Sequence, residues 1–260
     1  MLQVLFGGLR QLVRDLLSAL DAALTPGRPA WKLLVPMVAG LFAAWIVYVP
    51  IHELLHVAGC LVTGGSVTEL RLAPIYGASL LKRIFPFITP SSEYAGRLSG
   101  FSTGGSDLVY LATDAAPYLL TILVGVPLLR ALARRGDAAR SGPGAGARIW
   151  LLGPAVVTAA APVISLTGDY YEMASILLTK GYALSGVTGL EVLRSDDLFK
   201  LIADLQGGEV VLPVAGMRGT AAAASVIGCS LILALWLASC TYKLGMLWER
   251  LMARMRPRPS

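Results

Sequence analysis

The only two histidines of the chain lie four residues apart, in the segment His52-Glu53-Leu54-Leu55-His56. On an α-helix with about 3.6 residues per turn, residues four apart project from one face, so both imidazoles can bind a single metal ion. Glu53 lies beside them and can accept a proton from a water molecule that zinc acidifies. The spacing therefore predicts a zinc site with His52 and His56 as ligands and Glu53 as general base. The alternative is a chance match, with two core or interfacial histidines beside an incidental glutamate.

The composition is that of an integral membrane protein. Of the 260 residues, 55% are hydrophobic and only 15% are charged, and the mean hydropathy is +0.67, which is too apolar for an ordinary soluble domain. The formal net charge is +6, but the basic residues cluster in short segments beside apolar runs, as in cytoplasmic loops of membrane proteins. We therefore expect a multi-pass protein of the cell (plasma or inner) membrane, in contact with the lipid bilayer, and no nucleic acid partner.

Four apolar stretches are long enough to cross about 30 Å of hydrocarbon as helices. They are residues 33–63, 108–133, 149–179 and 220–248. Pro50 is expected to break the first helix just before His52, because proline removes an intrahelical hydrogen bond. In the third stretch, similar breaks are offered by Gly153, Pro154, Pro162 and Gly168. The expected fold class is an all-α integral membrane protein with about four transmembrane helices.

Smaller elements flank these stretches. Residues 1–24 carry leucines at helical spacing and predict an amphipathic helix in the membrane interface, although a helix that binds a soluble partner would show the same pattern. Residues 67–72 alternate apolar and charged side chains and predict a strand in a small hairpin or re-entrant element. Residues 195–197 predict the cap of a short amphipathic helix. We divide the chain into residues 1–30, a membrane-embedded core at 31–180, a connection at 181–219, and a fourth span with a basic tail at 220–260.

Arginine placement predicts the orientation of these spans. Residues 134–148 and the tail after residue 248 are rich in arginine and are expected to face the cytoplasm, together with the amino terminus. Counted from the opposite ends at about 1.5 Å per residue, His52, His56, Asp114 and Asp169 all lie roughly 10 to 17 Å deep. Carboxylates at such depth usually face a partner or a cavity. Alternatively, Asp169 lies at the headgroups and Asp114 only marks a helix start.

Taken in chain order, these features resemble the site-2 protease family of intramembrane zinc metalloproteases. The match covers roughly residues 33–180: the motif helix, a glycine pair at 64–65 with a strand-like segment, a second span, and an aspartate late in a third span. The resemblance implies that His52, His56 and Asp169 bind Zn²⁺ while Glu53 acts as general base in the hydrolysis of peptide bonds.

The chain departs from the usual pattern of that family at two places. The family aspartate commonly lies in Asn-Pro-x-x-Asp-Gly or Leu-Asp-Gly, whereas residues 166–170 read Leu-Thr-Gly-Asp-Tyr. The second span often carries Ala-Gly-Pro followed by Asn, whereas residues 115–118 read Ala-Ala-Pro-Tyr. The residue that stabilises the oxyanion is therefore unassigned, and Asp114 and Glu172 remain alternative third ligands. In many family members the site lies toward the cytosol, which conflicts with the orientation that the arginines predict.

The sequence thus favours a zinc metalloendopeptidase acting on membrane-embedded or membrane-adjacent protein or peptide substrates. One alternative is a non-enzymatic transporter in which the same ionisable groups line an ion or proton path. Another is a metalloprotease-like scaffold that has lost activity and binds partners. Cys60, Cys229 and Cys240 have no metal-ligand spacing and are expected to be small buried apolar residues.

Overall fold

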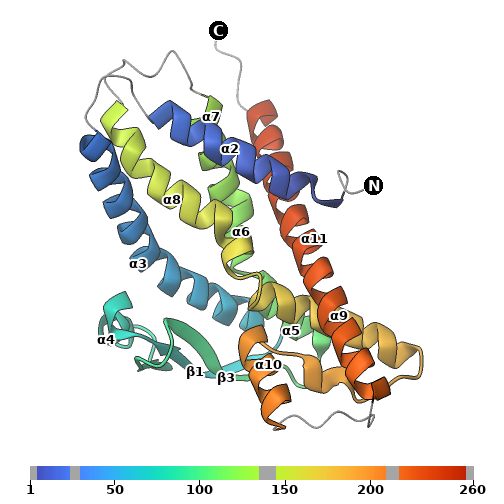
Figure 1. The fold of residues 1–260 in the computed structure, drawn as a ribbon. Coiled ribbons are helices and arrows are strands. Elements are labelled where there is room, and N and C mark those ends of the chain that lie inside the picture. Colours follow the sequence, from blue (N-terminus) through green and yellow to red (C-terminus); the bar gives the residue numbers. More distant parts are fainter. Residues whose placement is uncertain (1–4, 24–29, 135–144, 209–216, 256–260) are drawn as a thin grey trace. The chain divides into compact units, whose positions relative to one another are not determined.

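The structure, a computed structural model, describes residues 5–23, 30–134, 145–208 and 217–255. It is mostly helical with one small three-stranded sheet (Figure 1). The chain forms two compact units, a larger one of residues 7–161 and 241–260 and a smaller one of residues 1–6 and 162–240. Some arginines used to predict the orientation lie outside the described residues: Arg135, Arg140, Arg256 and Arg258.

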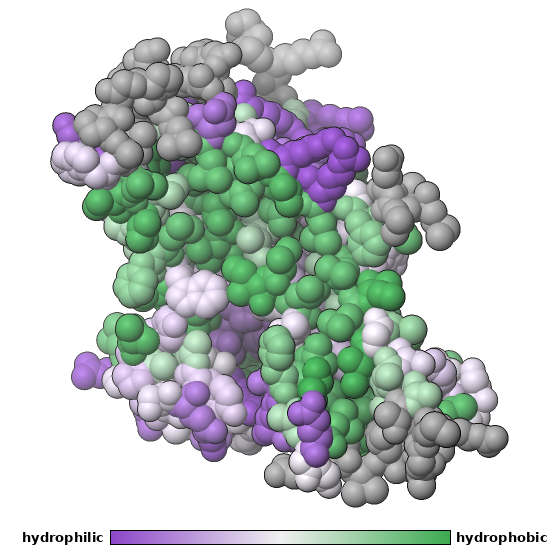
Figure 2. Space-filling view, in the orientation of Figure 1, coloured by the Kyte–Doolittle hydropathy of each residue, from purple (hydrophilic) through white to green (hydrophobic). Residues whose placement is uncertain are grey.

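Three helical stretches of the described residues are long and apolar enough to cross a membrane: Leu34–Val62, Arg148–Leu184 and Ala223–Met255. A fourth candidate is broken, because Asp107–Ala115 and Tyr118–Arg134 meet at an angle of 45°. In Figure 2, apolar side chains gather over α3 (Ala30–Val62) and α8 (Ala145–Ile164), and polar side chains gather over the sheet. These features support the prediction of a membrane protein with three such helices, or four if the bent pair forms one span.

The predicted break at Pro50 is wrong. Helix α3 contains Pro36 and Pro50 and still runs without interruption from Ala30 to Val62. A proline removes one backbone donor and bends a helix, but an apolar segment without water around it keeps its remaining hydrogen bonds by continuing the helix. Of the breaks predicted in the third stretch, those at Gly153, Pro154 and Pro162 are wrong, because α8 runs through them. The chain leaves the helix at residues 165–168, between α8 and α9 (Asp169–Leu184), as predicted for Gly168.

The amino-terminal amphipathic helix is present as α2 (Gly7–Ala23). Its apolar face packs against α7 (Val126–Arg134), and Leu12 is buried with Leu129 in one cluster. Asp15 of α2 accepts hydrogen bonds from Arg130 of α7 at 2.9 Å and from Tyr242 of α11 (Met217–Met255) at 2.7 Å. Part of the face predicted to contact lipid is therefore covered by protein.

The second membrane candidate is a chain of short helices. It consists of α5 (Asp107–Ala115), α6 (Tyr118–Leu120), a π-helical turn η2 (Thr121–Gly125) and α7. Ser106 caps α5, its hydroxyl accepting a hydrogen bond from the backbone N–H of Val109. Helix α5 lies close against α3, because a Cβ on Gly59 of α3 would lie 2.6 Å from the carbonyl oxygen of Ala112.

The sheet has the strand order β2-β1-β3. Strand β1 (Ser66–Leu72) pairs in parallel with β2 (Ile88–Pro90) and antiparallel with β3 (Gly96–Ser102). Between β1 and β2 lie the turn η1 (Pro74–Tyr76) and helix α4 (Ala78–Leu81). The predicted strand is confirmed, but a three-stranded sheet replaces the predicted hairpin, because the polar residues 96–102 pair through their backbone.

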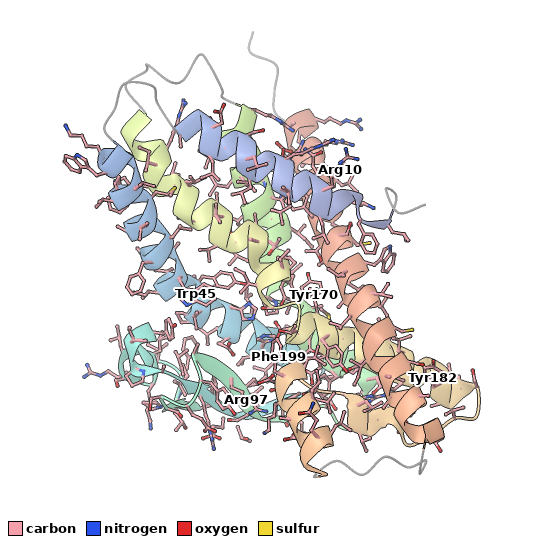
Figure 3. The ribbon with its side chains drawn as sticks, in the orientation of Figure 1. Arg10, Trp45, Arg97, Tyr170, Tyr182 and Phe199 are labelled. Carbon is pink, nitrogen blue, oxygen red and sulfur yellow. The ribbon has the colours of Figure 1, made fainter. Side chains whose placement is uncertain are left out.

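One face of the sheet packs on α3. Leu70, Leu72 and Ile88 are fully buried in a cluster with Val57 of α3. Trp45, which Figure 3 labels on α3, donates a hydrogen bond from its indole N–H to the Tyr76 hydroxyl at 3.1 Å. On the exposed part of β1, a hydrogen bond from the Ser99 hydroxyl lowers the pKa of Glu69, and Arg71 lowers it further. The sheet is thus fixed to the helix that carries the histidine motif.

The smaller unit contains α9, the turn η4 (Leu190–Leu193), α10 (Leu198–Gly207) and the first part of α11. The Asp197 carboxylate caps α10 by accepting hydrogen bonds from the backbone N–H groups of Phe199 and Lys200. This confirms the short capped helix predicted after residue 195. Leu198 and Leu201 of α10 pack with Tyr171 of α9.

Candidate metal centre

Helix α3 brings the two histidines of the motif together. His52 and His56 are both buried, with 8% and 7% of their surface exposed, and their Nε2 atoms lie 3.1 Å apart. Because α3 is continuous through Pro50, the one-face geometry expected for residues four apart is preserved. Two imidazole nitrogens therefore face the same point.

The other nitrogen of each imidazole is already engaged. His56 Nδ1 lies 2.9 Å from the backbone carbonyl oxygen of Thr113, and since a carbonyl can only accept, Nδ1 donates this hydrogen bond and Nε2 is the nitrogen that can bind a metal ion. His52 Nδ1 lies 2.8 Å from the Tyr48 hydroxyl, and the Tyr118 ring packs edge-on against His52. Such partners fix the orientation of metal-binding histidines.

The separation of the two histidine nitrogens is that of two ligands in a tetrahedral metal site. Two nitrogens bound at 2.0–2.1 Å to one zinc ion lie roughly 3.3 Å apart, close to the 3.1 Å between the two Nε2 atoms. Within the described residues, one set of three His, Cys, Asp or Glu side chains could hold a metal ion: His52 and His56 of the larger unit and Asp169 of the smaller one.

The alternative third ligands are not in this group. Asp114 and Glu172 are buried, with 5% and 7% of their surface exposed, but neither belongs to the three-residue set. The cysteines do not belong to it either. Cys60 is buried as predicted, whereas Cys229 is exposed and Cys240 intermediate, so the prediction of burial is wrong for Cys229. An apolar face of a candidate membrane helix needs no protein cover, which removes the reason for burial.

Glu53 packs against the sheet. Its surface is 9% exposed, and a Cβ built on Gly96, the first residue of β3, would lie 2.6 Å from the Glu53 Cδ and 2.8 Å from its Oε1. Only a residue without a side chain allows the β3 backbone to approach the carboxylate this closely. Strand β3 thus forms one wall around Glu53.

Three of these contacts were missed by reasoning from the sequence. Tyr48 could have been found, because it lies one helical turn before His52. The Thr113 carbonyl and Gly96 carry no such signal, because one is a backbone group brought close by helix packing and the other stands in a polar stretch with several glycines.

Comparison with models of known protein families, with curated proteins and with solved structures found no match.

Proposed function

We propose that this chain is a membrane-embedded zinc metalloendopeptidase that hydrolyses peptide bonds of membrane-embedded or membrane-adjacent substrates. One observation carries the proposal: two buried imidazoles whose Nε2 atoms face each other at 3.1 Å, with both Nδ1 atoms engaged and a buried carboxylate beside them. Histidines that only fill space in a protein core do not require partners that hold both Nδ1 atoms while the two Nε2 atoms face each other.

In this proposal His52, His56 and Asp169 would hold the zinc ion. When bound, zinc would polarise the carbonyl of the scissile bond and acidify a water molecule. Glu53 would accept the proton of that water and pass it to the amine that leaves. Tyr48 and the Thr113 carbonyl would hold the two imidazoles in the ligating orientation.

The sheet offers a place for an extended substrate. A strand can be added only where a neighbour is missing, and β1 already has neighbours on both sides at Leu70–Leu72. Within the described residues β3 is an edge strand. A substrate paired with the outer edge of β3 would run past Gly96 and therefore past Glu53.

The test is Glu53→Gln in the full chain, reconstituted in vesicles with candidate single-span substrates. The variant keeps size and hydrogen bonding but cannot take up the proton, so it should retain about one zinc ion per chain while cleavage falls on the order of 10²-fold or more. Undiminished cleavage in Glu53→Gln would refute the mechanism.

A transporter is the second candidate function. Asp114 and Glu172 favour it, because both are buried carboxylates on candidate membrane helices and neither belongs to the three-residue metal group. Buried ionisable groups in membrane helices often form ion or proton paths. Proton or cation flux measured in the same vesicles separates the two proposals. Flux that disappears in Asp114→Asn, together with no cleavage by the wild type, would select the transporter.

A further inference from the structure

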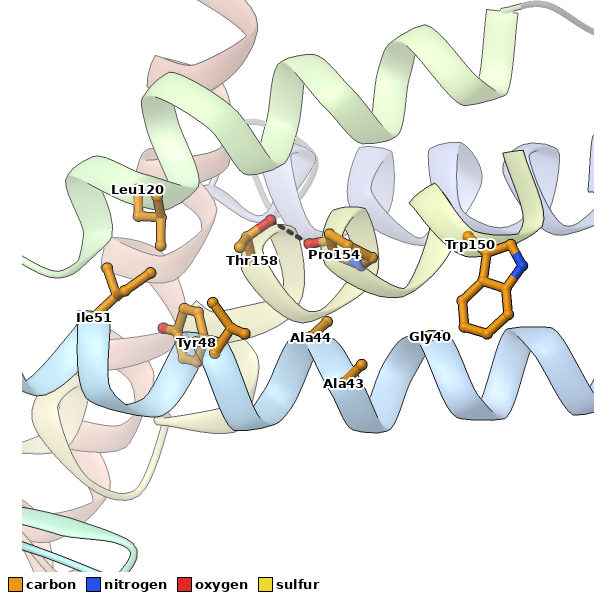
Figure 4. Close-up of a pocket in the computed structure, with 10 residues that line it drawn as sticks. Gly40, Ala43, Ala44, Tyr48, Ile51, Leu120, Trp150, Pro154 and Thr158 are labelled. Carbon is orange, nitrogen blue, oxygen red and sulfur yellow. Dashed lines mark hydrogen bonds between the residues drawn. The ribbon is translucent and has the colours of Figure 1, made fainter. Parts of the chain in front are cut away.

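A cavity of about 390 Å³ lies between α3 and α8, within the larger unit (Figure 4). Its walls include Gly40, Ala44, Tyr48 and Ile51 of α3 and Trp150 and Thr158 of α8. On α3 these residues recur along one helix face for eleven residues, which is about 16 Å at 1.5 Å per residue. The cavity is therefore elongated and lies within the apolar part of two candidate membrane helices.

Near Gly40, at one end of the cavity lining, the two helices cross closely. A Cβ on Gly153 of α8 would lie 2.6 Å from the backbone nitrogen of Leu41, and a Cβ on Gly40 would lie 3.2 Å from the carbonyl oxygen of Trp150. The two backbones thus touch at this point, as small residues allow. Beyond the crossing, the space between the helices is lined by side chains that do not fill it.

The hydroxyl groups in the wall have partners within the protein. Tyr48 bonds to His52 Nδ1, and Thr158 donates its hydroxyl to the carbonyl oxygen of Pro154 at 2.6 Å. The carbonyl oxygen of Thr158 in turn accepts a hydrogen bond from Thr121 at 2.7 Å. An extended peptide would bring unpaired N–H and C=O groups into an apolar space, at a cost of several kcal/mol each, so the cavity favours an occupant without such groups.

A whole transmembrane helix is too large to be enclosed in this cavity. A helix about 10 Å wide occupies roughly 1,250 Å³ over 16 Å, about three times the cavity volume of 390 Å³. The volume is instead within the range of small-molecule sites, which are mostly apolar. Val47, which lines the cavity, exposes 58% of its surface, so the space continues the apolar surface that α3 would present to lipid.

We propose that this cavity binds one acyl chain of a membrane phospholipid. The chain lies along α3 from Gly40 toward Ile51 and contacts the ring of Tyr48, the residue that orients His52. The proposed lipid site does not depend on the proposed peptidase activity, because no proposed zinc ligand lines the cavity.

The test uses the full chain in phosphatidylcholine nanodiscs that contain a small fraction of phosphatidylcholine with a photoreactive diazirine in one acyl chain. After irradiation, peptide mapping should find labels on the cavity residues of both α3 and α8, rising to saturation with the labelled fraction. Ala44→Leu fills the cavity and should reduce this labelling about tenfold. Ala39→Leu, an equal substitution at an exposed site of α3 outside the cavity, should leave it unchanged.

Equal labelling of the two variants would overturn the proposal, and so would labels spread over lipid-exposed positions such as Phe42. Should Ala44→Leu fail to fold, Ala43→Leu fills the same cavity from its open side and carries the same expectation. Loss of lipid labelling when a single-span substrate is added would assign the cavity to substrate instead. Zinc content and cleavage are measured separately, so failure of the peptidase proposal leaves this result interpretable.

Discussion

Replacing Gly96 with alanine should inactivate the proposed enzyme without removing its metal. The new Cβ would lie 2.6 Å from the Glu53 Cδ, whereas ordinary contacts begin at 3.4 Å. The carboxylate or the β3 backbone must therefore move by about 0.8 Å, the difference between these two distances. Displacements of about 1 Å at a reacting group cost on the order of 10²-fold in rate, which corresponds to about 2.7 kcal/mol in activation free energy.

The assay compares zinc content, thermal unfolding and cleavage kinetics of wild type and Gly96→Ala in the same vesicles. We expect kcat to fall about 10²-fold, because the base is displaced, while zinc content stays at about one ion per chain. The atoms that the new Cβ would meet belong to the Glu53 side chain, so movement of this side chain with β3 in place should change KM much less than kcat.

Gly100→Ala is the matched control. Gly100 lies on the same strand, and a Cβ there would lie 2.7 Å from the backbone nitrogen of Glu69, so the crowding is similar but distant from Glu53 along β3. If both variants lose activity equally, integrity of the sheet and not the position of Glu53 is the cause. Full activity in a folded Gly96→Ala protein would refute the reasoning altogether.

Three further predictions concern the metal centre and are checked by zinc analysis of purified protein. His56→Ala should remove the roughly one zinc ion per chain expected for this site, and full retention would reject the site. Asp169→Ala should weaken zinc binding more than either Asp114→Ala or Glu172→Ala, and metal release by Asp114→Ala alone would reassign the third ligand. Tyr48→Phe removes the hydrogen bond to His52 and should weaken zinc affinity about 10- to 100-fold with an unchanged unfolding temperature, a result checked by chelator competition.

Local features of this protein were predictable from its sequence because they depend on residues close together in the chain. The shared face of His52 and His56 follows from helix periodicity, and strand β1 follows from alternation at residues 67–72. The cap of α10 follows from the preference of aspartate for helix starts. The candidate membrane helices follow from the length of apolar stretches.

The tertiary structure determines which parts of the chain contact these local elements. Pro50 remains inside a continuous helix, because a proline's local effect is outweighed where the rest of the helix stays hydrogen bonded. The Thr113 carbonyl reaches His56 across 57 residues, and Gly96 reaches Glu53 across 43 residues of sequence. The cavity beside Tyr48 lies between α3 and α8, which are far apart in the chain and approach closely at Gly40 and Gly153. Contacts of this kind depend on how elements pack, and a periodic pattern within one element carries no information about its neighbour.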